Sequence, residues 1–261
     1  MPETAGVAQD GRGVALVTGA GRRIGRAIAL ELAQSDFDVV VHYGTSAAEA
    51  VEVARQVESR GRRAVAMACD LADATAVQGL VARAAAALGP VTCLVNSASI
   101  FLDDRIETLD AAVWDNQQAV NLRAPILLSK AVAAGLPAGR TGAIINIIDQ
   151  RVWRLTPQFF SYTASKAGLW AVTQTLAQAL APRIRVNAVG PGPVLKSIHQ
   201  TDAEFAREAE ATILGRATGA EEIAAAVRYI LDARSMTGQM IALDGGQHLA
   251  WQTPDVIGGT G

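Results

Sequence analysis

Residues 14–25 read VALVTGAGRRIG and lead from an apolar strand pattern, through a glycine-rich turn, into a helix pattern. Glycines in such a turn let the backbone approach a pyrophosphate closely, and the helix N-terminus favours its negative charge. Gly19, Gly21 and Gly25 are spaced one residue too widely for the G-x-G-x-x-G pattern, so the turn alone could be ordinary loop chemistry. Its position directly after the first predicted strand indicates a dinucleotide site.

Short apolar runs alternate with alanine-rich helical patterns along almost the whole chain. This alternation predicts a parallel sheet covered by helices on both faces, and no repeat or linker divides residues 1–261, so we expect one domain. Residues 195–215 interrupt the pattern with polar and charged side chains, and we interpret them as a mobile substrate lid. The predicted strands are 14–18, 39–43, 64–69, 91–96, 143–148, 185–189 and 239–243, and the predicted helices are 24–34, 47–59, 74–88, 111–134, 162–180 and 220–231.

The composition supports this fold class and excludes others. Half of the 261 residues are hydrophobic and only 5% are aromatic, which suits buried parallel strands rich in aliphatic side chains. A net charge of −2 leaves no basic footprint for nucleic acid, and no apolar stretch reaches membrane-spanning length. Residues 1–12 are polar and predict a flexible terminus, not a signal peptide. We expect a cytoplasmic protein without nucleic-acid or membrane partners, with Cys69 and Cys93 reduced and buried and no metal site.

A phenol and an ammonium group lie one helical turn apart in the segment SYTASK, residues 161–166. Tyr162 and Lys166 share a helix face because they are four residues apart. The cation is expected to lower the pKa of the phenol, ordinarily about 10, towards the range useful for proton transfer. Such pairs are common on solvated helix faces, so this pair indicates catalysis only if the rest of the chain builds a cofactor site around it.

The end of the second predicted strand bears on cofactor choice. Enzymes that use NAD place an acidic residue there to bind the adenosine ribose, but residues 42–46 read HYGTS and contain no carboxylate. Asp38 lies at the beginning of the strand and is expected to point away. Arg22 and Arg23 in the glycine-rich turn could bind a 2′-phosphate, or could be solvated surface charges. These residues favour NADPH over NADH.

Together these elements resemble the short-chain dehydrogenase/reductase family over nearly all of the chain. The resemblance rests on the turn TGAGRRIG, Cys69-Asp70-Leu71, Asn96-Ser97-Ala98, Asn121, Tyr162–Lys166 and Pro191-Gly192. It implies a Rossmann-type, doubly wound α/β fold of about seven parallel strands in the order 3-2-1-4-5-6-7. It also implies a homotetramer assembled through the predicted helices 111–134 and 162–180.

The resemblance assigns roles to individual residues. Tyr162 is implied as the proton donor, Lys166 as the residue that binds the nicotinamide ribose, and Asn121 as the support of a water-linked proton path. Asp70 and Leu71 are implied to hold the adenine. The residues expected to contact NADPH are Gly19, Gly21, Arg22, Arg23, Ile24, His42, Tyr43, Ser46, Asp70, Leu71, Asn96, Ala98, Tyr162, Lys166, Pro191 and Gly192.

Two departures from the family pattern narrow the resemblance. Arg23 stands where the family turn usually has glycine, and Asp149 replaces the usual catalytic serine thirteen residues before Tyr162. Both features resemble the pteridine reductase branch, which includes dihydromonapterin reductases. By that resemblance Ser99 hydrogen-bonds the polar edge of a pterin, Phe101 stacks on its face, and Arg23 bridges the ring and the cofactor phosphates.

The C=N bond of a pterin gives a chemical reason for an aspartate at position 149. A carbonyl reductase uses a neutral hydroxyl donor at the serine position, whereas reduction of a C=N bond requires a proton on nitrogen. We expect Asp149 and Tyr162 to contact the substrate and to deliver this proton, while NADPH gives a hydride to a dihydropterin or dihydrofolate. Asp149 could instead cap a loop or pair with Arg151 or Arg154, and Phe101 could be an ordinary core aromatic.

Two other functions stay open. The chain could reduce a different carbonyl or imine, because Thr45 and Ser97 depart from residues common in the pteridine reductase branch. It could also be a regulatory protein that binds NADPH as a sensed ligand. Retention of Tyr162, Lys166 and Asn121 argues against a sensor, which needs no proton relay.

Overall fold

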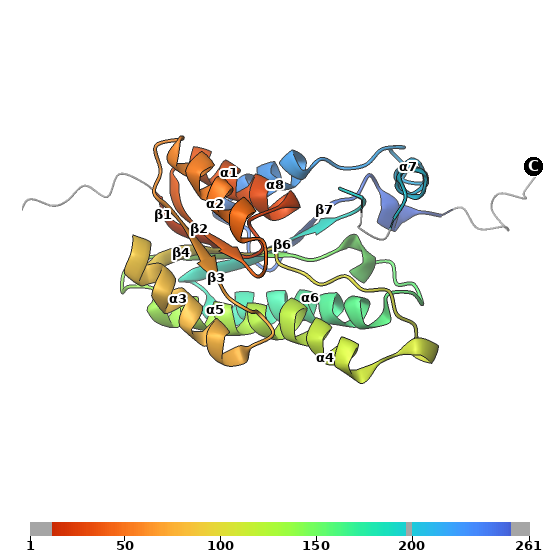
Figure 1. Ribbon diagram of the computed structural model, residues 1–261, viewed down its shortest axis with the longest axis horizontal. Helices are drawn as coiled ribbons and strands as arrows, with labels where there is room; N and C mark the ends of the chain where they lie inside the picture. Colours follow the sequence, from red (N-terminus) through yellow and green to blue (C-terminus); the bar gives the residue numbers. More distant parts are fainter. Residues whose placement is uncertain (1–11, 197–199, 252–261) are drawn as a thin grey trace, which may run out of the picture.

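The computed structural model describes residues 12–196 and 200–251, and these contain a seven-stranded parallel sheet (Figure 1). Its strand order, β3-β2-β1-β4-β5-β6-β7, confirms the predicted Rossmann-type α/β fold. The order reverses between β1 and β4, and in such sheets the reversal opens a crevice for ligands at the carboxyl ends of the strands. The strands are β1 (Gly13–Val17), β2 (Phe37–Tyr43), β3 (Ala64–Ala68), β4 (Val91–Asn96), β5 (Gly142–Ile147), β6 (Ile184–Pro191) and β7 (Met240–Leu243).

Helices cover both faces of the sheet, as Figure 1 shows. Because the crossovers place them in two layers, each strand is buried between helices. One layer holds α1 (Arg23–Gln34), α2 (Ala47–Glu58) and α8 (Ala220–Asp232). The other holds α3 (Ala74–Leu88), α4 (Ala111–Gln118), α5 (Ala124–Gly135) and α6 (Phe160–Leu180).

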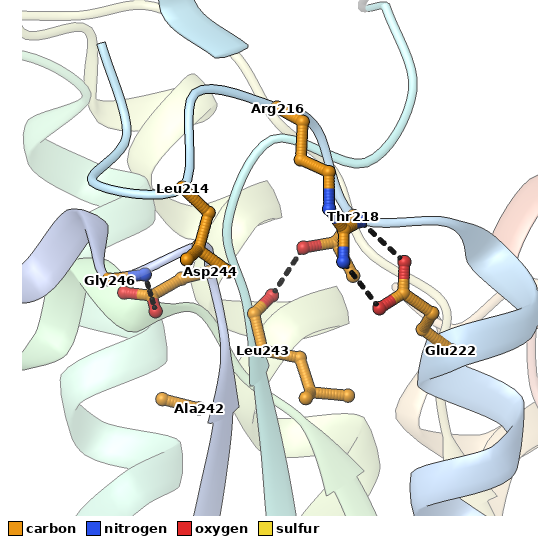
Figure 2. Close-up of a pocket in the computed structure, with 9 residues that line it drawn as sticks. Leu214, Arg216, Thr218, Glu222, Ala242, Leu243, Asp244 and Gly246 are labelled. Carbon is orange, nitrogen blue, oxygen red and sulfur yellow. Dashed lines mark hydrogen bonds and ion pairs between the residues drawn. The ribbon is translucent and has the colours of Figure 1, made fainter. Parts of the chain in front are cut away.

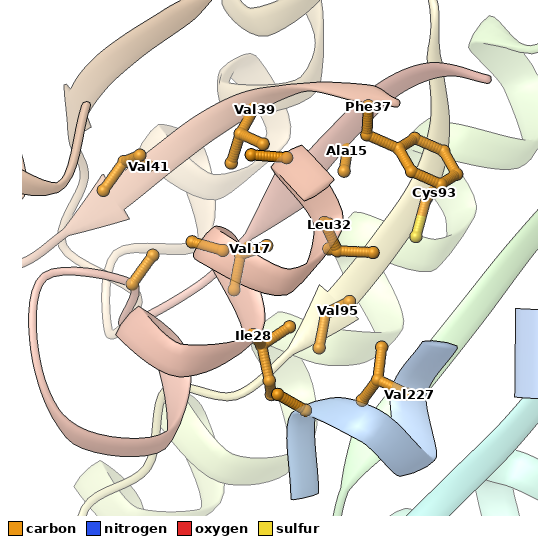
Figure 3. Packing of buried hydrophobic residues seen from close by; sticks show 14 of the residues in the cluster. Ala15, Val17, Ile28, Leu32, Phe37, Val39, Val41, Cys93, Val95 and Val227 are labelled. Carbon is orange, nitrogen blue, oxygen red and sulfur yellow. The ribbon is translucent and has the colours of Figure 1, made fainter. Parts of the chain in front are cut away.

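Successive residues of a strand point to opposite faces of the sheet and so build two hydrophobic cores. Val17 points towards α1 and packs in one core with Ile28 and Leu32 (Figure 3). Its neighbour Leu16 belongs to the other core, on the side of α3 and α5. All four side chains are completely buried, and each contributes about 1.5–3 kcal/mol by leaving water. The sheet therefore gives the loops at its carboxyl edge a rigid base.

The helix predicted over residues 111–134 is interrupted in the structure. α4 ends at Gln118, and a π-helical turn over Ala119–Arg123 precedes α5. Within this turn the Asn121 Nδ2 donates to the Ile100 carbonyl at 2.8 Å, and the Asn121 Oδ1 accepts from the Ile100 N–H at 2.8 Å. π-helical turns are rare and are frequent at functional sites. This one joins the helical layer to the loop after β4.

The predicted lid contains a further helix, α7 (Asp202–Glu210), at the carboxyl end of the sheet beyond β6 and β7 (Figure 1). Thr201 and Glu204 form a capping box that closes the first turn of α7. Residues 197–199, and residues 1–11 of the predicted flexible terminus, lie outside the described residues. The lid function stays a prediction.

Several other sequence predictions concern the two cysteines, Asp38 and membrane-spanning helices. Cys69 and Cys93 are free and buried, as predicted, and burial raises the pKa of the Cys93 thiol to about 12. Asp38 forms ion pairs with Arg62 at 3.2 Å and Arg63 at 2.7 Å, which hold it at the beginning of β2. Among the described helices, none has the length and apolarity needed to cross a membrane.

Candidate active site

The glycine-rich turn between β1 and α1 is tightly packed against its surroundings. Gly19 adopts a left-handed φ of +66°, and a Cβ at this position would lie 2.9 Å from the Ala98 Cα. A Cβ at Gly25 would overlap the Gly19 carbonyl. Both positions therefore require glycine, and the backbone stays open to a close-approaching ligand. Ile24 lies in the first turn of α1, whose N-terminus offers its positive end to an anion.

Hydrogen bonds fix this turn to the neighbouring strands. The Thr18 hydroxyl accepts from the N–H groups of Ser97 at 2.9 Å and Ala98 at 3.0 Å, which ties the end of β1 to the end of β4. The Gly19 N–H donates to the Nδ1 of His42 at 3.1 Å, and the His42 Nε2 lies 3.0 Å from the Cys69 carbonyl. The turn is thus held at the switch point of the sheet.

His42 holds the glycine-rich turn through a hydrogen bond, and its ring is neutral at physiological pH. Its side chain is fully enclosed, and burial lowers its pKa to about 4. With Nδ1 accepting from Gly19, the Nε2 proton is donated to the Cys69 carbonyl. Both ring nitrogens are engaged with backbone, so the structure gives His42 a supporting position, and its direct contact with the cofactor stays a prediction.

The two arginines of the turn have separate partners. Arg22 forms an ion pair with Glu49 on α2. Arg23 adopts a left-handed φ of +54°, and its guanidinium donates to the carbonyls of Leu195 and Lys196, both at 2.8 Å. Arg23 therefore connects the glycine-rich turn to the segment that follows β6. Its predicted contacts with the substrate ring and the phosphates stay predictions.

Four residues expected to contact the cofactor lie at or just after the ends of β2 and β3. Tyr43 ends β2, and Ser46 packs so closely against Gly21 that a Cβ there would lie 2.8 Å from the Ser46 hydroxyl. Asp70 is exposed after β3, and Leu71 beside it is buried. These side chains follow the carboxyl edge of the sheet.

Further residues expected to contact the cofactor lie at the ends of β4 and β6. The Asn96 Nδ2 donates to the Asn146 Oδ1 at 2.8 Å, whereas the Asn96 Oδ1 is a buried acceptor without a partner in residues 12–196 and 200–251. Pro191 ends β6, and Gly192 follows it directly against β7. An unsatisfied buried acceptor and close-packed glycines along one edge fit a polar, extended ligand such as a dinucleotide.

The predicted catalytic side chains converge between the end of β5 and α6. The Tyr162 hydroxyl donates to the Asp149 Oδ2 at 2.9 Å, and the Asp149 Oδ1 accepts from the Arg151 N–H at 2.8 Å. The Lys166 Nζ donates to the Ile147 carbonyl at 2.9 Å and lies 5.6 Å from the centre of the Tyr162 ring. Asp149 therefore meets Tyr162 directly, and it also caps the short turn that begins with Gln150.

Burial dominates the electrostatics of this cluster and corrects one prediction. The pKa of Tyr162 is raised well above 10, mainly by burial and further by the Asp149 carboxylate. Burial also raises the pKa of Asp149, and it lowers the pKa of Lys166 to about 8. The pKa of Tyr162 is therefore raised overall, not lowered as expected from the neighbouring Lys166, because the phenol is desolvated and faces a carboxylate. At neutral pH Tyr162 keeps its proton and can donate it.

Asn121 connects the loop after β4 to α6. Its Oδ1 accepts from the Ser99 hydroxyl at 3.2 Å, and its Nδ2 donates to the Ser165 hydroxyl at 3.1 Å, in addition to its bonds with Ile100. Asn121 is buried. It therefore holds Ser99 beside the tyrosine cluster, while a water-linked path from Asn121 to Lys166 stays a prediction.

An aromatic surface borders the phenol of Tyr162. Phe101 stacks on Phe159 with ring centres 4.4 Å apart and an angle of 13° between the planes. The ring of Phe101 also meets the ring of Tyr162 edge to face at 4.7 Å, and the Arg151 guanidinium lies over Phe159 at 5.1 Å. Phe101 is 36% exposed, so it is a surface of the site and not a core residue.

One buried acidic residue of this region carries no sequence motif. Asp104 follows Phe101 in the same loop, and its carboxylate binds the backbone N–H and the hydroxyl of Ser161. The two residues are 57 positions apart, so no local pattern joins them.

A separate cavity of about 190 Å³ lies beside the end of β7 (Figure 2). The Thr218 hydroxyl donates to the Leu243 carbonyl at 3.1 Å, and Arg216 pairs with Glu222 at 2.9 Å on its rim. None of the predicted catalytic residues lines this cavity, so the chemistry of the Tyr162 cluster, not the cavity volume, locates the candidate active site. Its lining residues are Leu214, Arg216, Thr218, Glu222, Ala242, Leu243, Asp244, Gly245 and Gly246.

Comparison with known proteins assigns the family. The family described as short chain dehydrogenase matches residues 13–206, which include the glycine-rich turn and the Tyr162–Lys166 pair. The chain belongs to the short-chain dehydrogenase/reductase family. Short-chain dehydrogenase/reductase eriH of Hericium erinaceus is 35% identical over 246 residues, covering 90% of this chain and 98% of that protein. The 3-oxoacyl-[acyl-carrier-protein] reductase FabG of Staphylococcus aureus is 31% identical, with the same coverage.

Solved structures of the family extend the comparison. FolM alternative dihydrofolate reductase 1 from Brucella canis, complexed with NADP, is 48% identical with a TM-score of 0.91, covering 95% of this chain and 98% of that one. A short chain dehydrogenase from Burkholderia cenocepacia in complex with NADP is 37% identical with a TM-score of 0.86, covering 91% and 98%.

The backbone explains one departure from the short-chain dehydrogenase/reductase pattern. Arg23 occupies the turn position at which the family usually has glycine, and its left-handed φ of +54° is the conformation that glycine adopts without strain. A non-glycine residue there costs roughly 1–2 kcal/mol. The two hydrogen bonds from the Arg23 guanidinium to residues 195 and 196 offset part of that cost.

Proposed function

We propose that this protein is an NADPH-dependent reductase that transfers a hydride to the C=N bond of a dihydropterin or dihydrofolate. The observation that carries the proposal is the 2.9 Å hydrogen bond from the buried Tyr162 hydroxyl to Asp149. A carboxylate at this position can hold the phenol of Tyr162 as the proton donor to a ring nitrogen. It is poorly suited to the developing alkoxide of a carbonyl reduction, which requires hydrogen-bond donors.

The cofactor is proposed on two grounds. The Brucella canis FolM and Burkholderia cenocepacia structures were both obtained with NADP. In this chain the end of β2 carries no carboxylate to repel a 2′-phosphate, and Arg23 supplies positive charge in the turn, while Arg22 is paired with Glu49. The glycine-rich turn would hold the pyrophosphate, and Lys166 the nicotinamide ribose. When bound, NADPH supplies the hydride.

The proton is supplied by the chain itself. Because burial and Asp149 raise the pKa of Tyr162, the phenol is neutral at physiological pH and acts as the general acid. The hydrogen bond to Asp149 fixes the position of the Tyr162 oxygen, from which the proton would pass to the ring nitrogen of the substrate. Lys166 is cationic below about pH 8 and stabilises the phenolate that remains after the proton has left.

The walls of the site suit a flat, polar ring. Phe101 is partly exposed beside its stacking partner Phe159, and the Ser99 hydroxyl lies in the same loop, held by Asn121. A planar heterocycle can stack on an aromatic ring while its edge forms hydrogen bonds. The FolM relative, described as an alternative dihydrofolate reductase, supports a substrate of this class.

A substrate panel tests the proposal. NADPH oxidation should be followed with dihydrobiopterin, dihydromonapterin, dihydrofolate and a simple ketone. We expect turnover of at least one reduced pterin or folate and little turnover of the ketone; the reverse result refutes the proposed substrate class.

Replacement of Asp149 provides the matched variant. Asp149→Ser should lower kcat on the pterin by about 10²-fold or more, because the proton-transfer partner of Tyr162 is lost. It should leave ketone reduction unchanged or improved. If kcat on the pterin is unchanged in Asp149→Ser, Asp149 serves only to cap the loop and takes no part in the reaction.

The alternative predicted from the sequence, reduction of another carbonyl or imine, is kept because the FabG relative is named as a 3-oxoacyl-[acyl-carrier-protein] reductase. A protein that only senses NADPH would bind it but would oxidise it with none of the tested substrates. The homotetramer and the cytoplasmic location stay predictions from the sequence.

A further inference from the structure

The N-terminus of α6 lacks a cap from its own sequence. The residue before the helix is Phe159, which has a left-handed φ of +56° and a side chain that cannot accept a hydrogen bond. The first N–H groups of a helix have no partners within the helix, so another part of the chain must supply acceptors. This matters here because Tyr162 lies in that first turn.

Asp104 supplies the missing cap from a distant loop. Its Oδ1 accepts from the Ser161 N–H at 3.0 Å, its Oδ2 accepts from the Ser161 hydroxyl, and its main-chain carbonyl accepts from the Phe160 N–H at 3.1 Å. Asp104 is only 5% exposed. A buried carboxylate is stable only when it is well hydrogen-bonded, and the positive end of a helix favours its charge.

The same contacts fix the loop that carries the aromatic wall. Asn121 holds this loop at Ile100 through two hydrogen bonds, and the Asp104–Ser161 contact holds it at the other end. Phe101 lies between these anchors. On the helix side, Ser161 lies between Phe159, which stacks on Phe101, and Tyr162.

We propose that Asp104 is a positioning residue for the reduction, which sets the Phe101 wall and the Tyr162 hydroxyl relative to each other. Asp104 itself touches no reacting group; it acts through Ser161 and through the short loop 100–104. The loop bears the face on which a flat substrate would stack, and the helix turn bears the proton donor. This inference rests on the proposed function for the substrate and on the observed contacts for the geometry.

The positioning role predicts a kinetic pattern that a purely stabilising cap would not produce. Without Asp104, the loop and the helix turn lose their shared anchor, so Phe101 and Tyr162 can shift independently. A displacement of about 1 Å at a reacting group can cost about 10²-fold in rate. Most residues expected to contact NADPH, including the glycine-rich turn between β1 and α1, lie outside loop 100–104 and the first turn of α6, so the Kd for NADPH should change little.

The experiment compares three variants of the full chain with the wild type. For Asp104→Ala we expect kcat/KM for the dihydropterin to fall by at least about tenfold, with a raised KM and a lowered kcat, and Kd for NADPH to stay within about twofold. Asp104→Asn retains an acceptor for the Ser161 N–H and should recover part of the loss. Asp110→Ala is the matched control, because Asp110 caps α4 through the N–H groups of Ala112 and Val113.

The control separates positioning from stability. Asp110→Ala should lower Tm as a lost cap does but keep kcat/KM close to that of the wild type. If Asp104→Ala lowers Tm while kcat/KM stays within about twofold of the wild type, the positioning role is refuted. If Asp104→Ala does not fold, Ser161→Ala removes only the hydroxyl contact and should still raise KM; an unchanged KM and kcat in that variant also refutes the proposal.

The outcome also distinguishes this inference from the proposed function. If the wild type reduces a carbonyl and no pterin, the proposed substrate class fails. The same variants are then compared on the carbonyl, where a displaced Tyr162 still lowers kcat in Asp104→Ala but not in Asp110→Ala. Equal kcat values in the two variants would overturn the positioning role independently of the substrate.

Discussion

Acid should destabilise this fold through His42, the buried ring that holds the glycine-rich turn. Burial lowers the pKa of His42 from 6.5 to about 4 in the folded chain. Because the folded pKa is depressed, the unfolded chain binds the proton first as the pH falls, so stability is present above about pH 6.5 and is lost between about pH 6.5 and 4. The loss amounts to about 2 kcal/mol at pH 5 and about 3 kcal/mol below pH 4.

The measurement is urea unfolding, followed by circular dichroism, at about pH 7.5 and about pH 5. His42→Gln is the comparison, because glutamine offers one donor and one acceptor but does not titrate. All other titrating groups are shared by the two proteins, so the difference isolates His42. We expect the wild type to lose about 2 kcal/mol more than His42→Gln between the two pH values.

The same titration should appear in cofactor binding. The Gly19 N–H donates to the Nδ1 of His42, and protonation of Nδ1 removes this acceptor and places a second donor against the turn. The affinity of the wild type for NADPH should therefore fall more steeply than that of His42→Gln as the pH drops through about 4, the pKa of His42 in the folded chain. Parallel pH dependence of stability in the two proteins would refute the structural role assigned to the ring.

Three further predictions follow from the catalytic cluster and the turn. Tyr162→Phe should lower kcat by about 10²–10⁴-fold while Kd for NADPH stays unchanged, because the ring contact with Phe101 remains and only the proton is lost; equal loss of both would indicate a structural role. In a pH profile, kcat/KM of the wild type should decline as the pH rises through about 8, where Lys166 loses its charge, and a profile flat across that range would contradict the assignment. Arg23→Ala should weaken NADPH more than NADH in direct binding measurements, whereas equal weakening would exclude a contact with the 2′-phosphate.

Much of the fold could be predicted because its signals are local. Strand and helix periods, the glycines of residues 19–25 and the four-residue spacing of Tyr162 and Lys166 depend only on neighbours in the chain. The position of Asp149 thirteen residues before Tyr162 likewise indicated proximity, and the structure brings the two side chains into contact. These features predicted the sheet and the edge at which the candidate site lies.

The tertiary structure decided what depends on burial and on distant contacts. The π-helical turn around Asn121 interrupts a helix that is continuous by its pattern, and the Asp104–Ser161 cap joins residues 57 positions apart. The shift of the Tyr162 pKa has the opposite direction to the one expected from the sequence. Spacing alone suggests that a nearby lysine lowers it, but desolvation and the facing carboxylate raise it, and both are properties of the packed chain. The sequence determined that Tyr162, Lys166 and Asp149 meet at one edge of the sheet. Packing determined how strongly these groups are desolvated, and therefore that Tyr162 keeps its proton.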